Sequence, residues 1–394
     1  MPDAHTTLTA GEVTARNFPR SPISVAQVRE GGFACEDLWF PSVVARRSAL
    51  EHNLTRFAQW CRDRGVDLAP HGKTTMSPQL WQAQLDHGAW GITAATVAQA
   101  RAMRDHGISR VLIANEILDE DQALWLAQAN KDPHLDYYCL VDSREGLAVL
   151  DDAGRAAGTR IPVLVELGVA GRRTGVRSVE EGVALAEQVA ASAHVQLAGV
   201  EGYEGVHPGN RAESTVRDVS TWLTSLVELV RAIDSAAGFE DVEEILFTAG
   251  GSAFPDLAAD ALGGISGVSR PVRPIVRSGC YLTHDHQSYE RSSPLRSAAE
   301  EDPLIPALTC LARVNSAPEP GVALLTVGKR DVPTDIDLPI ILNARGRDGT
   351  QRDAAGMVIT ELNDHHAFVT DPSSALRPGD LVELGLSHPC TTFD

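Results

Sequence analysis

The chain has 394 residues, 43% hydrophobic and 22% charged, a composition typical of a globular protein with one large and one smaller domain. Its formal charge of −19 and pI near 5.1 argue against nucleic acid or membrane partners and favour a small-molecule ligand. The sequence contains no membrane-span-length apolar run and no signal-peptide pattern at its start, and its six cysteines form no CxxC pair. We therefore expect a cytoplasmic protein with reduced thiols.

Short apolar runs alternate with amphipathic segments along much of the chain. After an N-terminal extension (1–37), the run LWFPSVVARR (38–47) predicts a strand that joins a C-terminal β-domain. Eight further strands are predicted: VDLAP (66–70), GITAAT (91–96), RVLIAN (110–115), YYCLVD (137–142), PVLVEL (162–167), LAGVEGY (197–203), EILFTAG (244–250) and RPIVRSG (273–279). Segments between them have the three-to-four apolar spacing of helices: 96–106, 119–129, 179–191 and 214–237.

Eight strand–helix repeats favour a closed (β/α)₈ TIM-type barrel over an open doubly wound sheet. A Rossmann arrangement is the alternative, but no GxGxxG follows the first strand. We assign the barrel to residues 48–285. Residues 286–394 begin with a polar, proline-bearing link and continue with β-rich pieces, which predict a second, β-rich domain: ALTCLARVNS, GVALLTVG, LPIILNAR, GMVITELND, HAFVTD and DLVELGLS.

Lys73 lies in LAPHGKTTMSPQL, three residues after the first predicted barrel strand. The C-terminal ends of barrel strands carry catalytic groups, so the lysine is expected to point into the barrel mouth. Burial there would free its amine as a nucleophile toward an aldehyde. The alternative is an ordinary surface lysine near a turn.

Two glycine-bearing strand ends predict an anion site. FTAGGSAF (247–254) ends the seventh predicted strand, and VRSGCY (276–281) ends the eighth. Phosphate binding requires backbone N–H groups that side chains do not obstruct, and barrels commonly hold phosphate after these two strands. Either motif alone is more often a plain turn.

A third candidate is the C-terminal segment LGLSHPCTTFD, where His388 and Cys390 are separated by one residue. Residues i and i+2 of an extended segment face the same side, so both side chains can bind one metal ion. Nitrogen with soft sulfur favours Zn²⁺ over Mg²⁺. The alternative is a surface histidine beside an ordinary cysteine.

Taken together, these motifs resemble those of the D-threonine aldolase and D-serine dehydratase family, whose members use pyridoxal 5'-phosphate on an alanine-racemase-like barrel with a C-terminal β-domain. The likeness runs from about residue 38 to the C-terminus. It rests on PHGKTTMSPQL, VELGVAGRRTGV (165–176), EGYEG (201–205), TAGGS (248–252), VRSGCY, LNDHHAF (362–368) and LSHPCTTFD. The HPC ending resembles the dehydratase or deaminase branch, because the aldolase branch usually has aspartate in place of Cys390.

The resemblance implies a set of cofactor-binding positions: His71, Lys73, Arg173, Tyr203, Gly250, Gly251, Ser252, Gly279 and Cys280. Lys73 matches the lysine that forms an imine with the cofactor, Arg173 an arginine beside its ring, and Tyr203 a nearby tyrosine. The glycine-bearing positions match the phosphate loops, and His388 and Cys390 match the protein ligands of the divalent metal.

Two residues depart from the family pattern. They affect the prediction of the substrate pocket more than the prediction of cofactor binding. Gly168 replaces an acidic residue, and Thr326 replaces the acid of a DAG motif.

The resemblance also implies a reaction and an assembly. Lys73 removes the substrate's α-proton, and zinc assists departure of the β-hydroxyl, so that D-serine yields pyruvate and ammonia. The alternative is an aldolase that produces glycine and an aldehyde, with His207, His365 or His366 as base. A non-catalytic cofactor-binding protein is a third reading, against which the metal pair argues. The family likeness implies a homodimer.

Overall fold

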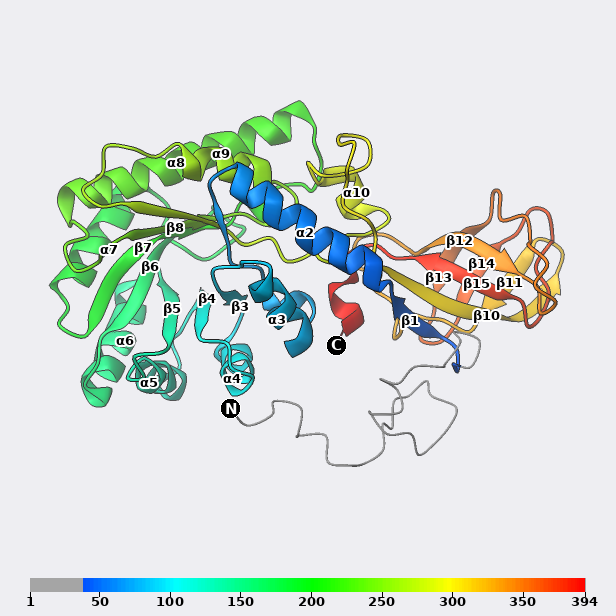
Figure 1. Ribbon diagram of the computed structural model, residues 1–394, viewed down its shortest axis with the longest axis horizontal. Helices are drawn as coiled ribbons and strands as arrows, with labels where there is room; N and C mark the ends of the chain where they lie inside the picture. Colours follow the sequence, from blue (N-terminus) through cyan, green and yellow to red (C-terminus); the bar gives the residue numbers. More distant parts are fainter. Residues whose placement is uncertain (1–37, 394) are drawn as a thin grey trace. The chain divides into compact units, whose positions relative to one another are not determined.

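A computed structural model describes residues 38–393, which form two compact units (Figure 1). The barrel unit comprises residues 51–282 and 289–304. The β-domain unit comprises, among the described residues, 38–50, 283–288 and 305–393. The predicted N-terminal extension, 1–37, lies outside the described residues.

The barrel unit is built on an eight-stranded parallel sheet with the order β2-β9-β8-β7-β6-β5-β4-β3. Its strands are β2 (Asp67–Leu68), β3 (Ile92–Ala94), β4 (Arg110–Glu116), β5 (Asp136–Val141), β6 (Ile161–Leu167), β7 (Val195–Gly202), β8 (Ile245–Ala249) and β9 (Val272–Val276). The two ends of this order meet through a parallel bridge between His71 and Thr93, where the Thr93 N–H donates to the Pro70 carbonyl at 2.9 Å. The eight predicted strands and the barrel are therefore confirmed.

Helices alternate with these strands and follow local sequence signals. They are α2 (Arg47–Asp63), α3 (Pro78–Asp86), α4 (Val97–Asp105), α5 (Glu120–Ala129), α6 (Arg144–Ala157), α7 (Val179–Ala191), α8 (Glu213–Ala236), α9 (Pro255–Gly263) and α10 (Ser288–Ser292). Four of them begin after a capping side chain that accepts a backbone N–H three residues further on: Thr96, Asp119, Ser143 and Ser178. Proline begins α3 and α9, where its missing N–H is not needed.

An apolar cluster fills the barrel interior. Its members come from the chain at and beside β2, β4, β5, β6, β8 and β9: Ala69, Leu112, Ala114, Leu140, Leu164, Leu246 and Ile275. Inward-facing side chains of this kind make the inside of such a barrel a packed core rather than a pore. The cluster defines the layer on which the candidate site is built.

The β-domain unit is antiparallel, with the order β12-β15-β10-β11-β14-β13. The short strand β1 (Ser42–Ala45) pairs with β10, Ser42 opposite Leu311. The other strands are β10 (Leu308–Glu319), β11 (Val322–Leu325), β12 (Ile340–Arg345), β13 (Val358–Leu362), β14 (Ala367–Thr370) and β15 (Leu381–Gly385). All six predicted β-rich pieces are thus strands.

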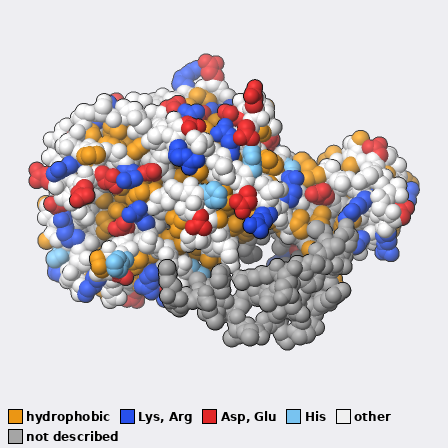
Figure 2. Space-filling model, in the orientation of Figure 1, with side chains coloured by type: hydrophobic (Ala, Val, Ile, Leu, Met, Phe, Trp, Pro, Cys, Tyr) orange, Lys and Arg blue, Asp and Glu red, His pale blue; other side chains and the backbone are white. Residues whose placement is uncertain are grey.

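On the face shown in Figure 2, basic and acidic side chains are interspersed rather than gathered into separate patches. Among residues 38–393, no helix is both long enough and apolar enough to cross a membrane.

Candidate active site

Lys73 lies in the 3₁₀ turn η2 (Gly72–Thr74), directly after β2 at the C-terminal ends of the barrel strands. Gly72 permits this tight turn, because a Cβ there would lie 2.4 Å from the Cε atom of Met103. The Trp81 Nε1–H donates to the Gly72 carbonyl at 3.0 Å and holds the turn in place. The Lys73 side chain is exposed, so its predicted burial is not observed. An exposed amine is accessible to an incoming aldehyde.

The predicted glycine loops follow β8 and β9 and are tied together. The Ser278 hydroxyl donates to the Gly251 carbonyl at 2.7 Å, and the Cys280 N–H donates to the Ser252 hydroxyl at 3.1 Å. The Gly250 backbone has a φ of +104°, a conformation that favours glycine. The sequence motifs TAGGS and VRSGCY therefore meet in one structure.

The loop after β9 lies against the turn that carries Lys73. A Cβ on Gly279 would lie 2.4 Å from the Thr74 hydroxyl and 2.8 Å from the His71 carbonyl, so only glycine fits. The N–H groups of Ser252 and Gly279 donate no hydrogen bond to any residue in the described range 38–393. Free backbone N–H groups beside glycines suit an anion, so these loops fit the phosphate of pyridoxal phosphate.

Replacing Gly279 with alanine should lower stability by about 1–3 kcal/mol, because the methyl group forces the β9 loop away from the Lys73 turn. The same displacement should weaken binding of pyridoxal phosphate. Urea unfolding and cofactor titration measure the two effects.

Gly263→Ala in α9 is the matched control, because the nearest atom outside its own helix, the Arg64 carbonyl oxygen, would be 3.7 Å from the new Cβ. Unchanged stability and cofactor affinity in Gly279→Ala would contradict the close approach.

Tyr203 and Arg173 lie beside these loops. The guanidinium carbon of Arg173 is 5.2 Å from the centre of the Tyr203 ring, a cation–π contact. A Cβ on Gly251 would lie 2.9 Å from the Tyr203 ring, and one on Gly205 would lie 2.3 Å from it. Burial raises the pKa of Tyr203 to about 12, so its hydroxyl stays protonated at neutral pH.

A ring of polar side chains lies one layer beyond the apolar barrel cluster. Alternate residues of a strand face the same side, so the residue two positions after an inward-facing one also faces inward. Six residues stand two positions after a member of the cluster: His71, Glu116, Asp142, Glu166, Thr248 and Arg277. Glu201 stands beside them because it is the register partner of Glu166 and of Thr248.

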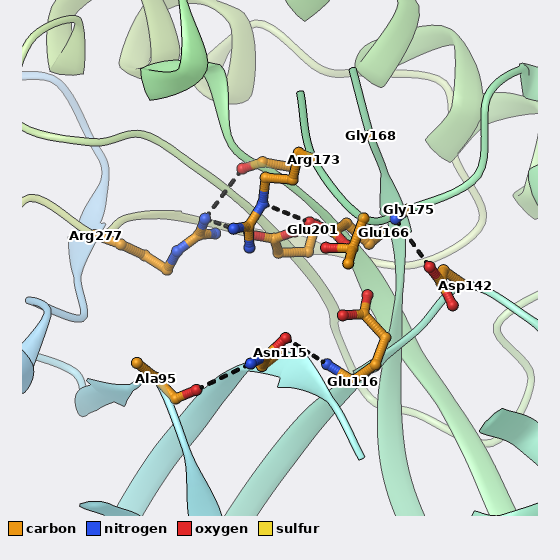
Figure 3. A network of polar contacts seen from close by, with 12 residues as sticks. Ala95, Asn115, Glu116, Asp142, Glu166, Gly168, Arg173, Gly175, Glu201 and Arg277 are labelled. Atoms are coloured by element: carbon orange, nitrogen blue, oxygen red, sulfur yellow. Dashed lines mark hydrogen bonds and ion pairs between the residues drawn. The ribbon is translucent and has the colours of Figure 1, made fainter. Parts of the chain in front are cut away.

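Ion pairs link members of this ring, and Figure 3 shows Arg277 and Arg173 beside the glutamates of the ring. Arg277, 1% exposed, pairs with the fully buried Glu201 and donates to the Thr248 hydroxyl at 2.9 Å. The Arg173 Nε–H donates to the fully buried Glu166 at 2.7 Å. Burial raises the pKa of Glu201, while the Arg277 guanidinium opposes that rise.

Sequence reasoning did not single out these buried carboxylates and Arg277. The available signal was a charged residue placed two positions after an inward apolar residue, as in LVEL and IVRS. Burial also lowers the pKa of His71, and the positive charges of Lys73, Arg277 and Arg173 lower it further. His71 is therefore neutral at pH 7 beside the lysine.

His388 and Cys390 lie at the C-terminal end of the β-domain unit, both half-buried. The predicted extended segment is wrong, because His388 has a φ of +51° and Cys390 lies in the 3₁₀ turn η4 (Pro389–Phe393). Their ligand atoms are within 4.8 Å of each other, which fits a single metal ion held by imidazole nitrogen and thiolate sulfur. The His388 Nδ1 atom is 2.5 Å from a carboxylate oxygen of Asp335. This contact orients the imidazole ring, an arrangement that sequence reasoning did not predict.

The three histidines considered as an aldolase base lie in both units. His207 follows η3 (Glu204–Val206) in the barrel unit, and burial lowers its pKa. His365 and His366 lie in the turn between β13 and β14 of the β-domain unit. Lys329, in the same unit, forms an ion pair with Asp364 at 3.2 Å.

Two family models match the chain. The alanine racemase N-terminal domain matches residues 46–239, and the serine dehydratase domain matches residues 307–394. The chain belongs to the D-threonine aldolase and D-serine dehydratase family. The alanine racemase match covers most of the barrel unit, and the serine dehydratase match covers most of the β-domain unit.

Named relatives of both kinds are similar to the chain. A D-threonine aldolase from Arthrobacter sp. is 28% identical over 90% of this chain and 86% of its own length. A D-threo-3-hydroxyaspartate dehydratase from Delftia sp. (strain HT23) is 29% identical over 62% of this chain and 61% of its own length, so the match spans less than two thirds of that relative. The solved D-threonine aldolase from Filomicrobium marinum is 24% identical, with a TM-score of 0.75 over 91% of this chain and 90% of its own. Solved D-threo-3-hydroxyaspartate dehydratase structures include a histidine-to-alanine variant and a cysteine-to-alanine variant in the metal-free form.

The structure explains why this family member has glycine at position 168. A Cβ on Gly168 would lie 1.8 Å from the Thr174 carbonyl oxygen, so no side chain fits there. The loop from 168 to 175 folds back on β6, where the Gly168 N–H donates to the Val176 carbonyl at 3.0 Å. Gly175, with a φ of +99°, donates its N–H to Asp142 at 3.0 Å. This tight loop presents Arg173 to the site.

Proposed function

We propose that this chain is a pyridoxal-phosphate-dependent lyase that removes water from a D-3-hydroxy amino acid such as D-serine and releases a 2-oxo acid and ammonia. The observation that carries the proposal is the close approach of Gly279 to the turn bearing Lys73. It places a glycine cradle suited to phosphate beside an accessible amine suited to an aldehyde, and pyridoxal phosphate has both groups.

Each residue of the barrel site has a role in this proposal. Lys73 would hold the cofactor aldehyde, and its Nζ atom would accept the substrate's α-proton. The loops after β8 and β9 bind the phosphate through their N–H groups. Arg173 and Tyr203 orient the cofactor ring. When bound, the cofactor supplies an electron sink for the α-carbon.

His388 and Cys390 hold the metal in this proposal, with zinc as the expected ion. The metal supplies Lewis-acid assistance to departure of the substrate's β-hydroxyl. Asp335 fixes the His388 ring through the 2.5 Å contact at Nδ1.

The cysteine at position 390 favours dehydration over the aldol cleavage proposed as the alternative. The Delftia relative is named a dehydratase, and a cysteine-to-alanine variant of a D-threo-3-hydroxyaspartate dehydratase is described as metal-free. The alternative has support from the Arthrobacter relative, a D-threonine aldolase whose match covers 90% of this chain. Both reactions need the same cofactor lysine and differ in the bond that breaks at the β-carbon.

The deciding experiment incubates the purified protein with D-serine, D-threonine and D-3-hydroxyaspartate and measures 2-oxo acid, aldehyde and glycine together. Formation of 2-oxo acid without glycine supports the dehydratase, whereas equal amounts of glycine and aldehyde support the aldolase. The L-enantiomers are the controls for stereochemistry. Bound cofactor with no product from any substrate would support the non-catalytic reading.

Asp335→Asn should weaken metal binding about 10- to 100-fold, because the neutral amide no longer holds the His388 ring as the carboxylate does. Competition with a chromophoric chelator measures the affinity without reference to activity.

Asp337→Asn is the matched control, since Asp337 accepts a hydrogen bond from Ser387 at 2.8 Å in the same loop. Equal affinities in the two variants would show that Asp335 does not orient the ligand.

A homodimer and a cytoplasmic location stay predictions from the family likeness and composition. Light scattering on the active protein tests the first, because a fully active monomer at assay concentration would refute it.

A further inference from the structure

Glu116 and Glu166 face each other with no donor between them. Glu166 is fully buried; one carboxyl oxygen accepts from Arg173 at 2.7 Å, and the other has no hydrogen-bond partner within the described residues. Both carboxyl oxygens of Glu116 are shielded from solvent and also lack a partner there. Figure 3 shows the Glu116 carboxyl pointing toward Glu166. Two ionised carboxylates in this position would repel each other without screening by water.

The surrounding charges do not compensate for two ionised groups. Asp142, after β5, brings a third carboxylate within 4.8 Å, and its hydrogen bond is to the Gly175 N–H. Arg277 is paired with Glu201 on β7. The buried thiol of Cys139 on β5 adds no positive charge, since burial raises its pKa. Arg173 alone is ion-paired with the carboxylate cluster among residues 38–393.

We propose that Glu116 is protonated at neutral pH and donates a hydrogen bond to Glu166. Through this carboxyl pair it positions the guanidinium of Arg173. The proton satisfies the orphaned oxygen of Glu166 and leaves one negative charge in the pair, which Arg173 balances. Burial first, and then Glu166 and Asp142, raise the pKa of Glu116 to about 9. Glu116 is thus a positioning residue that acts on Arg173 through Glu166.

The alternative occupant of the gap is a cation rather than a proton. A metal ion there would lie beside the Arg173 guanidinium, which repels it. A shared proton requires no additional positive charge, so the observations favour it. The role assigned to Arg173 rests on the proposed function, whereas the protonation of Glu116 does not.

The first test follows the stability of the full-length protein from pH 6 to 9 in wild type and Glu116→Gln. A raised pKa means that the folded protein retains a proton that the unfolded chain releases above pH 4.5. Stability is therefore lost as pH rises, and stops falling above about pH 9. The wild-type folding constant should fall up to about tenfold per pH unit relative to Glu116→Gln, whose amide donates to Glu166 at every pH.

Glu187→Gln, the same change at an exposed position of α7, should follow the wild-type curve. If the stability of wild type and of Glu116→Gln changes with pH in the same way, the proposal that Glu116 and Glu166 share a proton is overturned. A wild-type curve that shifts on addition of Mg²⁺ or Ca²⁺, with no such shift in Glu116→Gln, would replace the proton by a cation and also overturn it.

The second test measures the dissociation constant of pyridoxal phosphate. At pH 7 we expect Glu116→Ala to bind about tenfold more weakly, and Glu116→Gln to bind within about twofold of wild type, because only alanine removes the donor to Glu166. Between pH 8 and 10 the wild type should lose affinity relative to Glu116→Gln. Equal affinities in all three proteins at every pH would overturn the positioning role. If the wild type binds no cofactor at all, the proposed function fails. The stability test still shows whether Glu116 is protonated.

Discussion

Replacing Lys73 with alanine is expected to lower turnover at least about 1,000-fold and to abolish the visible absorbance of lysine-bound pyridoxal phosphate. One side chain both holds the cofactor and removes the α-proton, so its loss removes two functions together. The side chain is exposed, and the variant should therefore fold normally. Absorbance, turnover and urea unfolding of the same preparations measure the three expectations.

Borohydride reduction of the wild-type protein followed by peptide mapping should locate the cofactor on Lys73. Lys329→Ala is the matched control, because Lys329 is also exposed and its side chain pairs with Asp364 on the surface of the β-domain unit. It should keep both the absorbance and the activity. A pyridoxyl label on Lys329 would overturn the assignment.

Replacing Cys390 with alanine is expected to lower metal content and to reduce 2-oxo acid formation from D-serine by at least about 100-fold. Two protein ligands are too few for a closed structural zinc site, which normally has four, so the metal should serve the reaction rather than the fold. Exchange of the α-proton of D-serine in heavy water should continue, because that step needs Lys73 and the cofactor. Metal analysis, product assay and NMR-detected exchange measure these effects separately.

Cys310→Ala separates the metal role from a packing role. Cys310 lies on β10 in the β-domain core, and burial raises the pKa of its thiol to about 12, so it stays a neutral packing group. This variant should lose stability but keep its metal, whereas Cys390→Ala should melt close to wild type. Full dehydratase activity in Cys390→Ala, or loss of activity by unfolding, would show that the pair has no catalytic role.

The local elements of this protein follow from its sequence. All eight barrel strands were predicted because each apolar run is bounded by turn residues, and four helices begin at a Ser, Thr or Asp cap that the sequence displays. The approximate place of the glycine loops was also predictable. Parallel strands direct their C-terminal ends to one side, so motifs that end successive strands gather there whatever their distance along the chain.

Contacts between distant strands were decided only by the tertiary structure. Glu116 and Glu166 are 50 residues apart in sequence, and they face each other because their strands β4 and β6 both pair with β5 and direct alternate residues into the barrel. Asp335 and His388 are 53 residues apart, lie in loops of the β-domain unit, and meet at 2.5 Å. The sequence shows that each of these residues is charged or titratable. Its partner and its burial depend on strand register and barrel closure, which are set by the packing of the whole core rather than by any local pattern.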